Sequence, residues 1–230
     1  MIPKIIHYCW FGNKEKPKKV LKLINGWKRL LPDYQFIEWN ERNFDVFNAC
    51  DYVKEAYQNG KWAFVSDYVR IYALNKVGGI YLDTDVELIK SFDNYLDNSF
   101  FVSYESEVSL CTAIIGSSKD NPILDRMLAD YNKEQFSFSD KIQPNSERLL
   151  NYVESMNSES IAFNKEFQSN NIHIYPIDYF GAKDIHTYQL LKTDNTIAIH
   201  HLDATWYSNR KKFLRFCKKK VMAIVNVFRR

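Results

Sequence analysis

Short apolar runs and amphipathic stretches alternate along the first third of the chain. Residues 3–10 and 34–39 are short runs rich in β-branched and aromatic side chains, which is typical of buried strands. Between them, residues 17–31 carry apolar side chains three and four positions apart, with Pro17 at the start and Pro32 beyond the end, which predicts an amphipathic helix. A strand, a helix and a strand at this spacing predict a βαβ unit and favour a parallel sheet.

Residues 61–90 predict a buried helix, a glycine stop and a strand that ends in two acids. Asp67 and Arg70 lie within the apolar stripe of this helix, because residues three and four positions apart share one face. Gly78 and Gly79 suit the left-handed backbone conformation that ends a helix without a steric penalty. The two charges are therefore expected to be buried beside the sheet.

The strand that follows, residues 80–82, leads directly into Asp83-Thr84-Asp85. Side chains alternate along extended backbone, so Asp83 and Asp85 are expected on one side. Two neighbouring carboxylates repel each other unless a cation shares them. The pattern therefore predicts a cation site after this strand.

The rest of the chain predicts further strands and helices, and no repeat, low-complexity segment or linker divides it. The mid-strand His7 is expected to be a core histidine with its hydrogen bonds satisfied rather than a ligand. The apolar run 109–115 is β-branched enough to be a central strand, and 133–142 is expected to be a loop. We also expect strands at 86–89, 99–104, 171–176 and 196–201, and helices at 122–131, at 144–156 and, as one or two short pieces, within 44–59. These elements predict a single α/β domain over residues 1–209.

Composition also indicates in which cellular compartment the protein is expected. A chain of 230 residues can bury a sizeable core without disulfides. The four cysteines are scattered without metal-ligand spacing, the opening residues have no signal-peptide architecture, and no apolar run approaches the roughly 20 residues of a spanning helix. A reducing, cytoplasmic location is therefore expected. Aromatic residues make up 16% of the chain, a surplus that fills a core or lines a sugar- or base-binding surface.

The charge is unevenly distributed, although the net charge is only +3. Residues 204–230 contain nine Lys or Arg and no acid, which leaves 22 basic and 28 acidic residues, a balance of −6, for the rest. Residues 210–230 predict a helix whose apolar residues share one face, whereas most of its basic residues lie outside that apolar face. Such a helix suits an anionic membrane surface, and the alternative is packing of the apolar face on the domain. Nothing else in the chain predicts nucleic-acid binding.

Two motifs in residues 61–90 resemble a known family. S-D-x-x-R and G-G-x-Y-x-D-x-D resemble the signature of glycosyltransferase family 32 and of the related large clostridial toxin glucosyltransferases, and the opening I-P-K-I-I-H-Y-x-W-F-G resembles the start of that domain. The matching signature residues are Ser66, Asp67, Arg70, Gly78, Gly79, Tyr81, Asp83 and Asp85. The resemblance implies a GT-A type fold, a mixed and mostly parallel sheet flanked by helices, with the donor at the carboxyl ends of the strands.

The resemblance also implies roles for residues around the donor. Trp10 would stack on a uracil ring, with a core Trp at a strand end as the alternative. Asp67 and Arg70 would face the donor sugar and its phosphates, and the alternative is a structural buried ion pair. Tyr81 would contact the ribose or the diphosphate. Trp39 and Asn40 would lie near the donor, but their signal is weak.

A second segment, Ile197–Trp206, resembles the family's closing motif. His200, preferred over His201, would join Asp83 and Asp85 as a metal ligand, a set that suits Mn²⁺ or Mg²⁺. Thr205 stands where the family has Ser, and Trp206 would cover the diphosphate. A solvent-exposed histidine pair at a strand end is the alternative.

The function implied is a retaining, metal-dependent transfer of a hexose, galactose or glucose, from a UDP-sugar. The acceptor would be a glycan, carried on a lipid such as undecaprenyl diphosphate, in bacterial surface or capsular polysaccharide synthesis. The enzyme would lie on the inner face of the cell membrane. Two alternatives stay open: a non-catalytic metal-binding domain at the membrane surface, and a nucleotide-sugar pyrophosphatase. Motifs of P-loop, Rossmann, α/β-hydrolase and HExxH enzymes are absent from the sequence.

Overall fold

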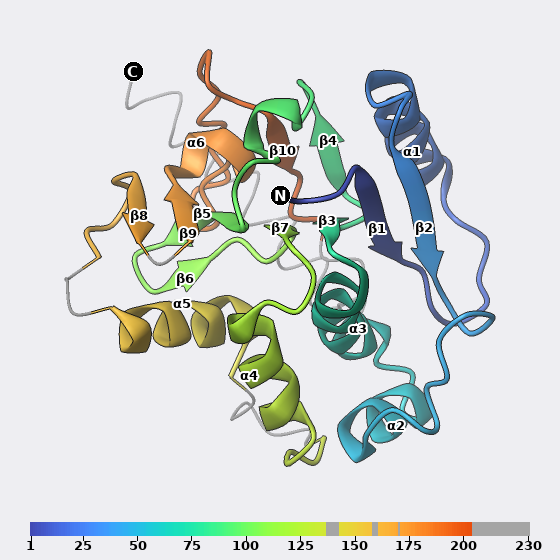
Figure 1. Ribbon diagram of the computed structural model, residues 1–230. Coiled ribbons are helices and arrows are strands. Elements are labelled where there is room, and N and C mark those ends of the chain that lie inside the picture. The colour runs from blue at the N-terminus through green and yellow to red at the C-terminus, as the bar shows by residue number, and fades with distance from the viewer. Residues whose placement is uncertain (137–142, 158–160, 170, 204–230) are drawn as a thin grey trace.

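The computed structural model describes residues 1–136, 143–157, 161–169 and 171–203. Its centre is an eight-stranded sheet of order β2-β1-β3-β7-β5-β9-β8, with β6 beside β5 (Figure 1). The strands β1, β2, β3, β5 and β9 run in one direction, and β7 and β8 run in the other. Their bounds are β1 (Ile5–Cys9), β2 (Gln35–Trp39), β3 (Gly79–Leu82), β5 (Phe100–Ser106), β6 (Ser109–Leu110), β7 (Ile114–Ser117), β8 (Phe167–Ser169) and β9 (Ile172–Tyr175). The predicted mixed, mostly parallel sheet is confirmed.

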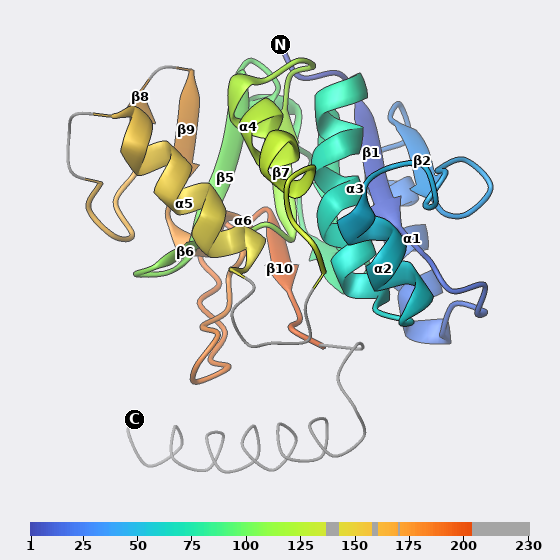
Figure 2. The same cartoon turned by 90° about the horizontal axis from the view of Figure 1, so that it is seen from below.

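Helices cover both faces of this sheet. On one face lie α2, α3, α4 and α5, which Figure 2 shows in front of the strands. On the other lie α1, α6 and a separate two-stranded sheet of β4 and β10 (Figure 1). The bounds are α1 (Lys18–Leu30), α2 (Asp51–Gln58), α3 (Trp62–Val77), α4 (Pro122–Tyr131), α5 (Asn145–Met156), α6 (Ile177–Phe180), β4 (Val86–Leu88), β10 (Ala198–His200) and a 3₁₀ turn at Asp93–Tyr95.

Alternation of apolar side chains along the central strands creates two hydrophobic cores. In β3, Ile80 and Leu82 pack toward α1, whereas Tyr81 packs toward α3. In β5, Phe101 joins the α1 side, and its neighbour Phe100 joins the α3 side. Strands buried on both faces read as continuous apolar runs, and this explains why the sequence pattern identified them.

The helix–glycine–strand prediction is confirmed at its boundaries. The helix α3 ends at Val77, and Gly78 and Gly79 have positive φ angles of 74° and 123°. A Cβ atom on Gly79 would lie 2.6 Å from the Ile5 carbonyl oxygen of the neighbouring strand. The stop therefore needs glycine both for the backbone conformation and for the close approach of β1.

One local prediction differs from the structure, and one strand was not predicted. The expected strand 109–115 is two strands, because the chain forms a short hairpin with β5 at β6 and then crosses to β7 between β3 and β5. The edge strand β8 had no sequence signal, since it is three residues long and half exposed. The prediction of one or two short helices within 44–59 is confirmed by α2, and Asp45 caps a turn before this helix by accepting the backbone N–H groups of Phe47 and Asn48.

The β4–β10 sheet holds the segment that follows β3. Its strands pair antiparallel, with His200 opposite Val86. The α1 side of this sheet is anchored by Trp27, whose indole N–H donates to the Val86 carbonyl at 2.9 Å. Among the described residues, no helix has both the length and the apolar character needed to cross a membrane.

Candidate active site

The acidic pair lies where the central sheet meets the small β4–β10 sheet. Asp83 and Asp85 occupy the tight connection between β3 and β4, and the Asp83 N–H donates to the Ala113 carbonyl at 2.9 Å. His200 ends β10, and its pairing with Val86 places it beside Asp85. The site therefore combines the carboxyl end of a parallel strand, where open α/β sheets bind ligands, with the end of a distant strand.

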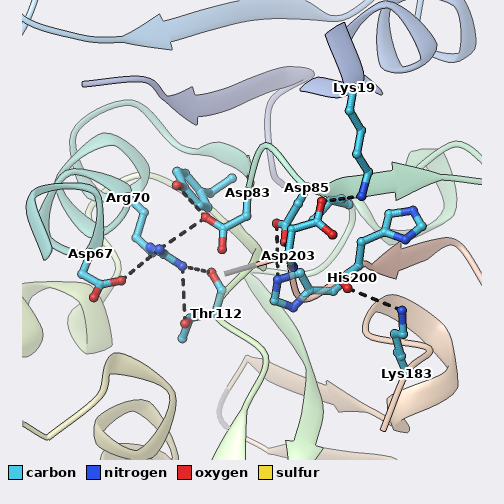
Figure 3. A network of polar contacts seen from close by, with 12 residues as sticks. Lys19, Asp67, Arg70, Asp83, Asp85, Thr112, Lys183, His200 and Asp203 are labelled. Carbon is cyan, nitrogen blue, oxygen red and sulfur yellow. Dashed lines mark hydrogen bonds and ion pairs between the residues drawn. The ribbon is translucent and has the colours of Figure 1, made fainter. Parts of the chain in front are cut away.

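Asp83, Asp85 and His200 converge as the closing motif predicted. One ligand atom from each lies within 4.8 Å of the other two, and the His200 Nε2 atom is 3.4 Å from Asp85 Oδ1 (Figure 3). Two carboxylates and an imidazole form a ligand set for Mn²⁺ or Mg²⁺, with positions left for phosphate oxygens and water. The residues present fit a divalent cation.

Asp85 and His200 form an ion pair. Burial by itself raises the pKa of Asp85, but the hydrogen bond and charge of His200 and the N–H of Asp203 outweigh it and hold this pKa well below its usual range. Burial lowers the pKa of His200, but Asp85 and then Cys111 outweigh it and raise this pKa. A cation that binds both side chains must therefore displace a proton from His200.

The neighbouring His201 points away from the two aspartates. Its Nε2 atom lies 2.8 Å from Glu87 Oε2, and its carbonyl oxygen accepts from Lys183 at 3.4 Å. His201 directly follows the end of β10, and consecutive side chains of extended backbone point to opposite sides. Of the two histidines, the geometry thus supports His200 as the candidate ligand.

Arg70 is the buried centre of the other half of the site. Its Nη2 atom lies 2.9 Å from Asp67 Oδ1 and 3.3 Å from Asp83 Oδ1, and its Nη1 atom donates to the Thr112 carbonyl at 2.7 Å (Figure 3). Its guanidinium also lies over the Tyr81 ring, 4.8 Å from the centroid. Because the N–H groups of Arg70 are directed at partners within the protein, Arg70 orients the carboxylates of Asp67 and Asp83.

Asp67 and Tyr81 differ in how they are held. Burial raises the pKa of Asp67 to about 6, although the charge of Arg70 opposes the shift. Its backbone carbonyl accepts from the Asn145 side chain on α5 at 2.8 Å. Tyr81 is 1% exposed and its hydroxyl donates to Asp83 Oδ1 at 2.9 Å. In this structure Tyr81 acts on Asp83, and its expected contact with ribose or diphosphate stays a prediction.

Two further acids lie at the site, and the sequence assigned no role to either of them. The Asp203 N–H donates to Asp85 Oδ2 at 2.8 Å, and the Asp203 carboxylate pairs with Lys19 on α1 (Figure 3). Glu105, on β5, lies close to His200 and Cys111, and its carboxylate accepts a long 3.4 Å hydrogen bond from Ser109. Asp203 belongs to the segment Ile197–Trp206, but only its contacts reveal its part in the site, and Glu105 has no motif around it.

The tryptophans at the ends of the first two strands differ in burial: Trp10 is partly exposed and Trp39 is buried. The half-buried Trp10 follows β1; its indole N–H donates to the Lys14 carbonyl at 2.6 Å, and Lys16 lies over its ring. Trp39 is buried and donates to Nδ1 of His7, whose Nε2 then donates to the Gly78 carbonyl at 2.8 Å. His7 is the satisfied core histidine that the sequence predicted. Thr205 and Trp206, and the predicted helix 210–230, lie outside the described residues.

Comparisons with known proteins agree with this geometry. Residues 17–102 match the family model described as the glycosyltransferase sugar-binding region containing the DXD motif. Inositol phosphoceramide mannosyltransferase 3 of Schizosaccharomyces pombe is 31% identical over 140 residues, which cover 60% of this chain and 39% of that protein. An uncharacterised glycosyltransferase of Acanthamoeba polyphaga mimivirus is 26% identical over 231 residues, which cover 95% of this chain and 87% of the relative.

A solved structure supports the fold. The PaToxG glycosyltransferase superposes with a TM-score of 0.52 at 18% identity, covering 68% of this chain and 71% of that one. Similarity at this level of identity concerns the fold alone, and the predicted GT-A type is confirmed. The chain spans well under half the length of the S. pombe relative.

Proposed function

We propose that this chain, which carries the DXD-containing sugar-binding region of the glycosyltransferases, transfers a hexose from a nucleotide sugar to a glycan acceptor with retention of configuration. One observation carries the proposal: Asp83, Asp85 and His200 converge at the carboxyl edge of the sheet, directly beside the buried Arg70. A purely structural ion-pair network would not need three cation ligands at this edge.

Each side chain has a distinct part in the proposed reaction. Asp83, Asp85 and His200 hold a divalent cation, which, when bound, neutralises charge on the departing diphosphate. Arg70 keeps Asp67 and Asp83 in place, since it contacts both. Trp10, at the carboxyl end of β1 and therefore at the same edge of the sheet, presents a partly exposed ring for the nucleobase.

Retention of configuration rests on the family resemblance. We infer a same-face displacement, in which the departing phosphate accepts the proton of the acceptor hydroxyl. Asp67 and Asp83 both contact the Arg70 guanidinium, and the Asp67 side chain is 28% exposed. One of its oxygens can therefore accept a hydrogen bond from a hydroxyl of the donor sugar. The residue facing the other side of the sugar is not assigned.

The donor and the acceptor are proposed from chemistry and from the relatives. UDP-glucose and UDP-galactose are the first candidates, and the S. pombe relative, named a mannosyltransferase, adds GDP-mannose. The name of that relative also specifies a lipid, inositol phosphoceramide, as its acceptor, which supports a lipid-linked acceptor here. A surface or capsular polysaccharide as the product, with undecaprenyl diphosphate as the carrier, remains part of the proposal.

A panel of nucleotide sugars tests the reaction. We expect slow hydrolysis of one donor without acceptor, dependent on Mn²⁺ or Mg²⁺, with the nucleoside diphosphate as product. Release of the nucleoside monophosphate would instead identify a pyrophosphatase. The matched controls are adjacent residues: His200→Asn should abolish hydrolysis and His201→Asn should not, because His201 faces Glu87. Equal effects of the two variants, or hydrolysis without metal, would refute the proposed site.

We also propose that residues 210–230 bring the enzyme to the cytoplasmic face of a membrane. Nine basic residues without an acid attract anionic lipids, at about 1 kcal/mol for each basic residue near the surface. The full chain should float with anionic liposomes, less so at high salt, and a chain that ends at Asn209 should stay in solution. If the full chain and the shortened chain behave alike, the segment has another role.

A further inference from the structure

A second set of metal ligands adjoins the first and shares one member with it. Glu105, Cys111 and His200 each bring one ligand atom within 4.8 Å of the other two. We propose that these three residues form a binding site for a soft or borderline cation such as Zn²⁺, and that this site competes with the Asp83–Asp85 site for His200.

The donor atoms decide which cation each set prefers. Glu105, Cys111 and His200 offer oxygen, sulfur and nitrogen, a combination that favours Zn²⁺ or Co²⁺ over Mn²⁺ or Mg²⁺. Tetrahedral zinc has bonds of about 2.0–2.3 Å to such atoms, which places its ligand atoms about 3.4–3.6 Å apart. The three ligand atoms lie within 4.8 Å of one another, so small side-chain rotations bring them to that spacing, and a fourth position stays open for water or an anion.

The fold holds these ligands on three separate segments. Glu105 lies near the end of β5, Cys111 in the turn between β6 and β7, and His200 at the end of β10. The turn is fixed because the Cys111 N–H donates to the Ser103 carbonyl at 2.8 Å. Cys111 is 1% exposed, whereas the His200 side chain is 14% exposed, so the sulfur is the less accessible of these two ligands.

Glu105 gives a second, independent reason to expect a cation. Its neighbours among the site acids all have a partner: Asp67 and Asp83 contact Arg70, and Asp85 contacts His200. Among the described residues no Lys or Arg forms an ion pair with Glu105, whose carboxylate accepts the long hydrogen bond from Ser109. A partly buried carboxylate in that position is stabilised when a cation binds beside it.

The two sites exclude each other through the chemistry of imidazole. A neutral histidine has one nitrogen lone pair, and its other nitrogen carries a proton, so His200 can bind only one of the two cations. Binding at the thiol-containing site also releases the Cys111 proton to solvent as the thiolate–metal bond forms. Zn²⁺ therefore removes a ligand from the Asp83–Asp85 site. Inhibition of turnover rests on the proposed function, but the binding itself does not.

Cobalt is the probe for this site, because a Co²⁺–thiolate bond absorbs in the near ultraviolet and Co²⁺ bound to oxygen and nitrogen alone does not. We expect metal-free, reduced full-length protein to develop this band with one equivalent of Co²⁺, and Zn²⁺ to remove it. Cys111→Ser should abolish the band, and Cys50→Ser, which alters a cysteine at the start of α2, should keep it. No band, or a band that survives in Cys111→Ser, would overturn the proposal.

A further variant guards against misfolding of Cys111→Ser. Glu105 is partly exposed, so Glu105→Gln should fold, and it should weaken Co²⁺ binding by on the order of 10-fold or more. Unchanged Co²⁺ affinity in Glu105→Gln would exclude Glu105 as a ligand and refute the site as proposed.

Competition between the cations tests the shared histidine without any measurement of activity. Excess Mn²⁺ should shift the Co²⁺ titration to higher concentrations in the wild type but not in Asp85→Asn, which lacks the Mn²⁺ site. Co²⁺ titrations that ignore Mn²⁺ in the wild type would refute the competition. If the chain hydrolyses no nucleotide sugar, the proposed function fails, yet the thiolate band still decides whether this site exists.

Discussion

Replacing Arg70 by methionine tests whether the donor side of the site is held by one buried charge. The guanidinium contacts Asp67 at 2.9 Å and Asp83 at 3.3 Å, and Arg70 is 6% exposed. Methionine fills a similar length without charge, so Arg70→Met leaves two carboxylates beside each other without a counter-ion. The change should destabilise the fold in proportion to their burial.

The magnitude follows from the loss of one partner in a buried pair. Such a loss reduces the free energy of unfolding by about 3–5 kcal/mol, because the remaining charge stays uncompensated. For a domain of this size the melting temperature should fall by roughly 6–20 °C. Arg126→Met, which alters an exposed arginine of α4, should change stability by only about 0.5 kcal/mol.

The loss of stability should depend on pH in a defined direction. Burial raises the pKa of Asp67 to about 6 even with Arg70 present, and removal of Arg70 raises it further. A carboxyl whose pKa is raised by folding loses stability as pH rises from its unfolded value toward its folded value. The loss of stability in Arg70→Met should therefore be small near about pH 4. It should be complete only above the pKa that Asp67 has in the folded variant.

Urea or thermal unfolding of the wild type and Arg70→Met across this pH range measures the deficit. Asp67→Asn added to Arg70→Met should recover part of it, because one of the two uncompensated charges is gone. A loss below about 1 kcal/mol at neutral pH, or a loss that grows as pH falls, would refute the idea that Arg70 compensates buried carboxylates.

Three further predictions concern the cation and the nucleotide. Asp85→Asn should abolish metal-dependent turnover in a folded protein, because an amide is a poorer ligand; full activity with Mn²⁺ would contradict the metal assignment, and Glu87→Gln is the control on the same segment. Trp10→Ala should weaken UDP binding about tenfold or more in calorimetry, since stacking contributes roughly 1–3 kcal/mol per base; unchanged affinity would make Trp10 a packing residue. Mn²⁺ affinity should rise with pH, because Asp85 raises the pKa of His200 and this proton must leave first; calorimetry that finds no proton release would disprove this order of events.

Much of the fold could be predicted because its signals are local. The βαβ unit, the buried helix α3, its glycine stop and the strand before Asp83 all follow from periodicity and backbone preference within about 30 residues. The burial of Arg70 and the partial burial of Asp67 followed from their place in an apolar stripe. By contrast, the division of 109–115 into β6 and β7 depends on pairing with β5 and β3, which no local pattern contains.

The site divides in the same way. The sequence by itself determined that two carboxylates follow a central strand and that a charged pair precedes it on a buried helix, because spacing along one element places those side chains. Only the tertiary structure shows that His200 lies beside Asp85, since His200 ends β10 opposite Val86 of β4. It also brought Glu105, Cys111 and Asp203 to the acids from segments far apart in the chain. Contacts of this kind depend on how distant strands pair and pack, so they exist only once the sheet has closed around them.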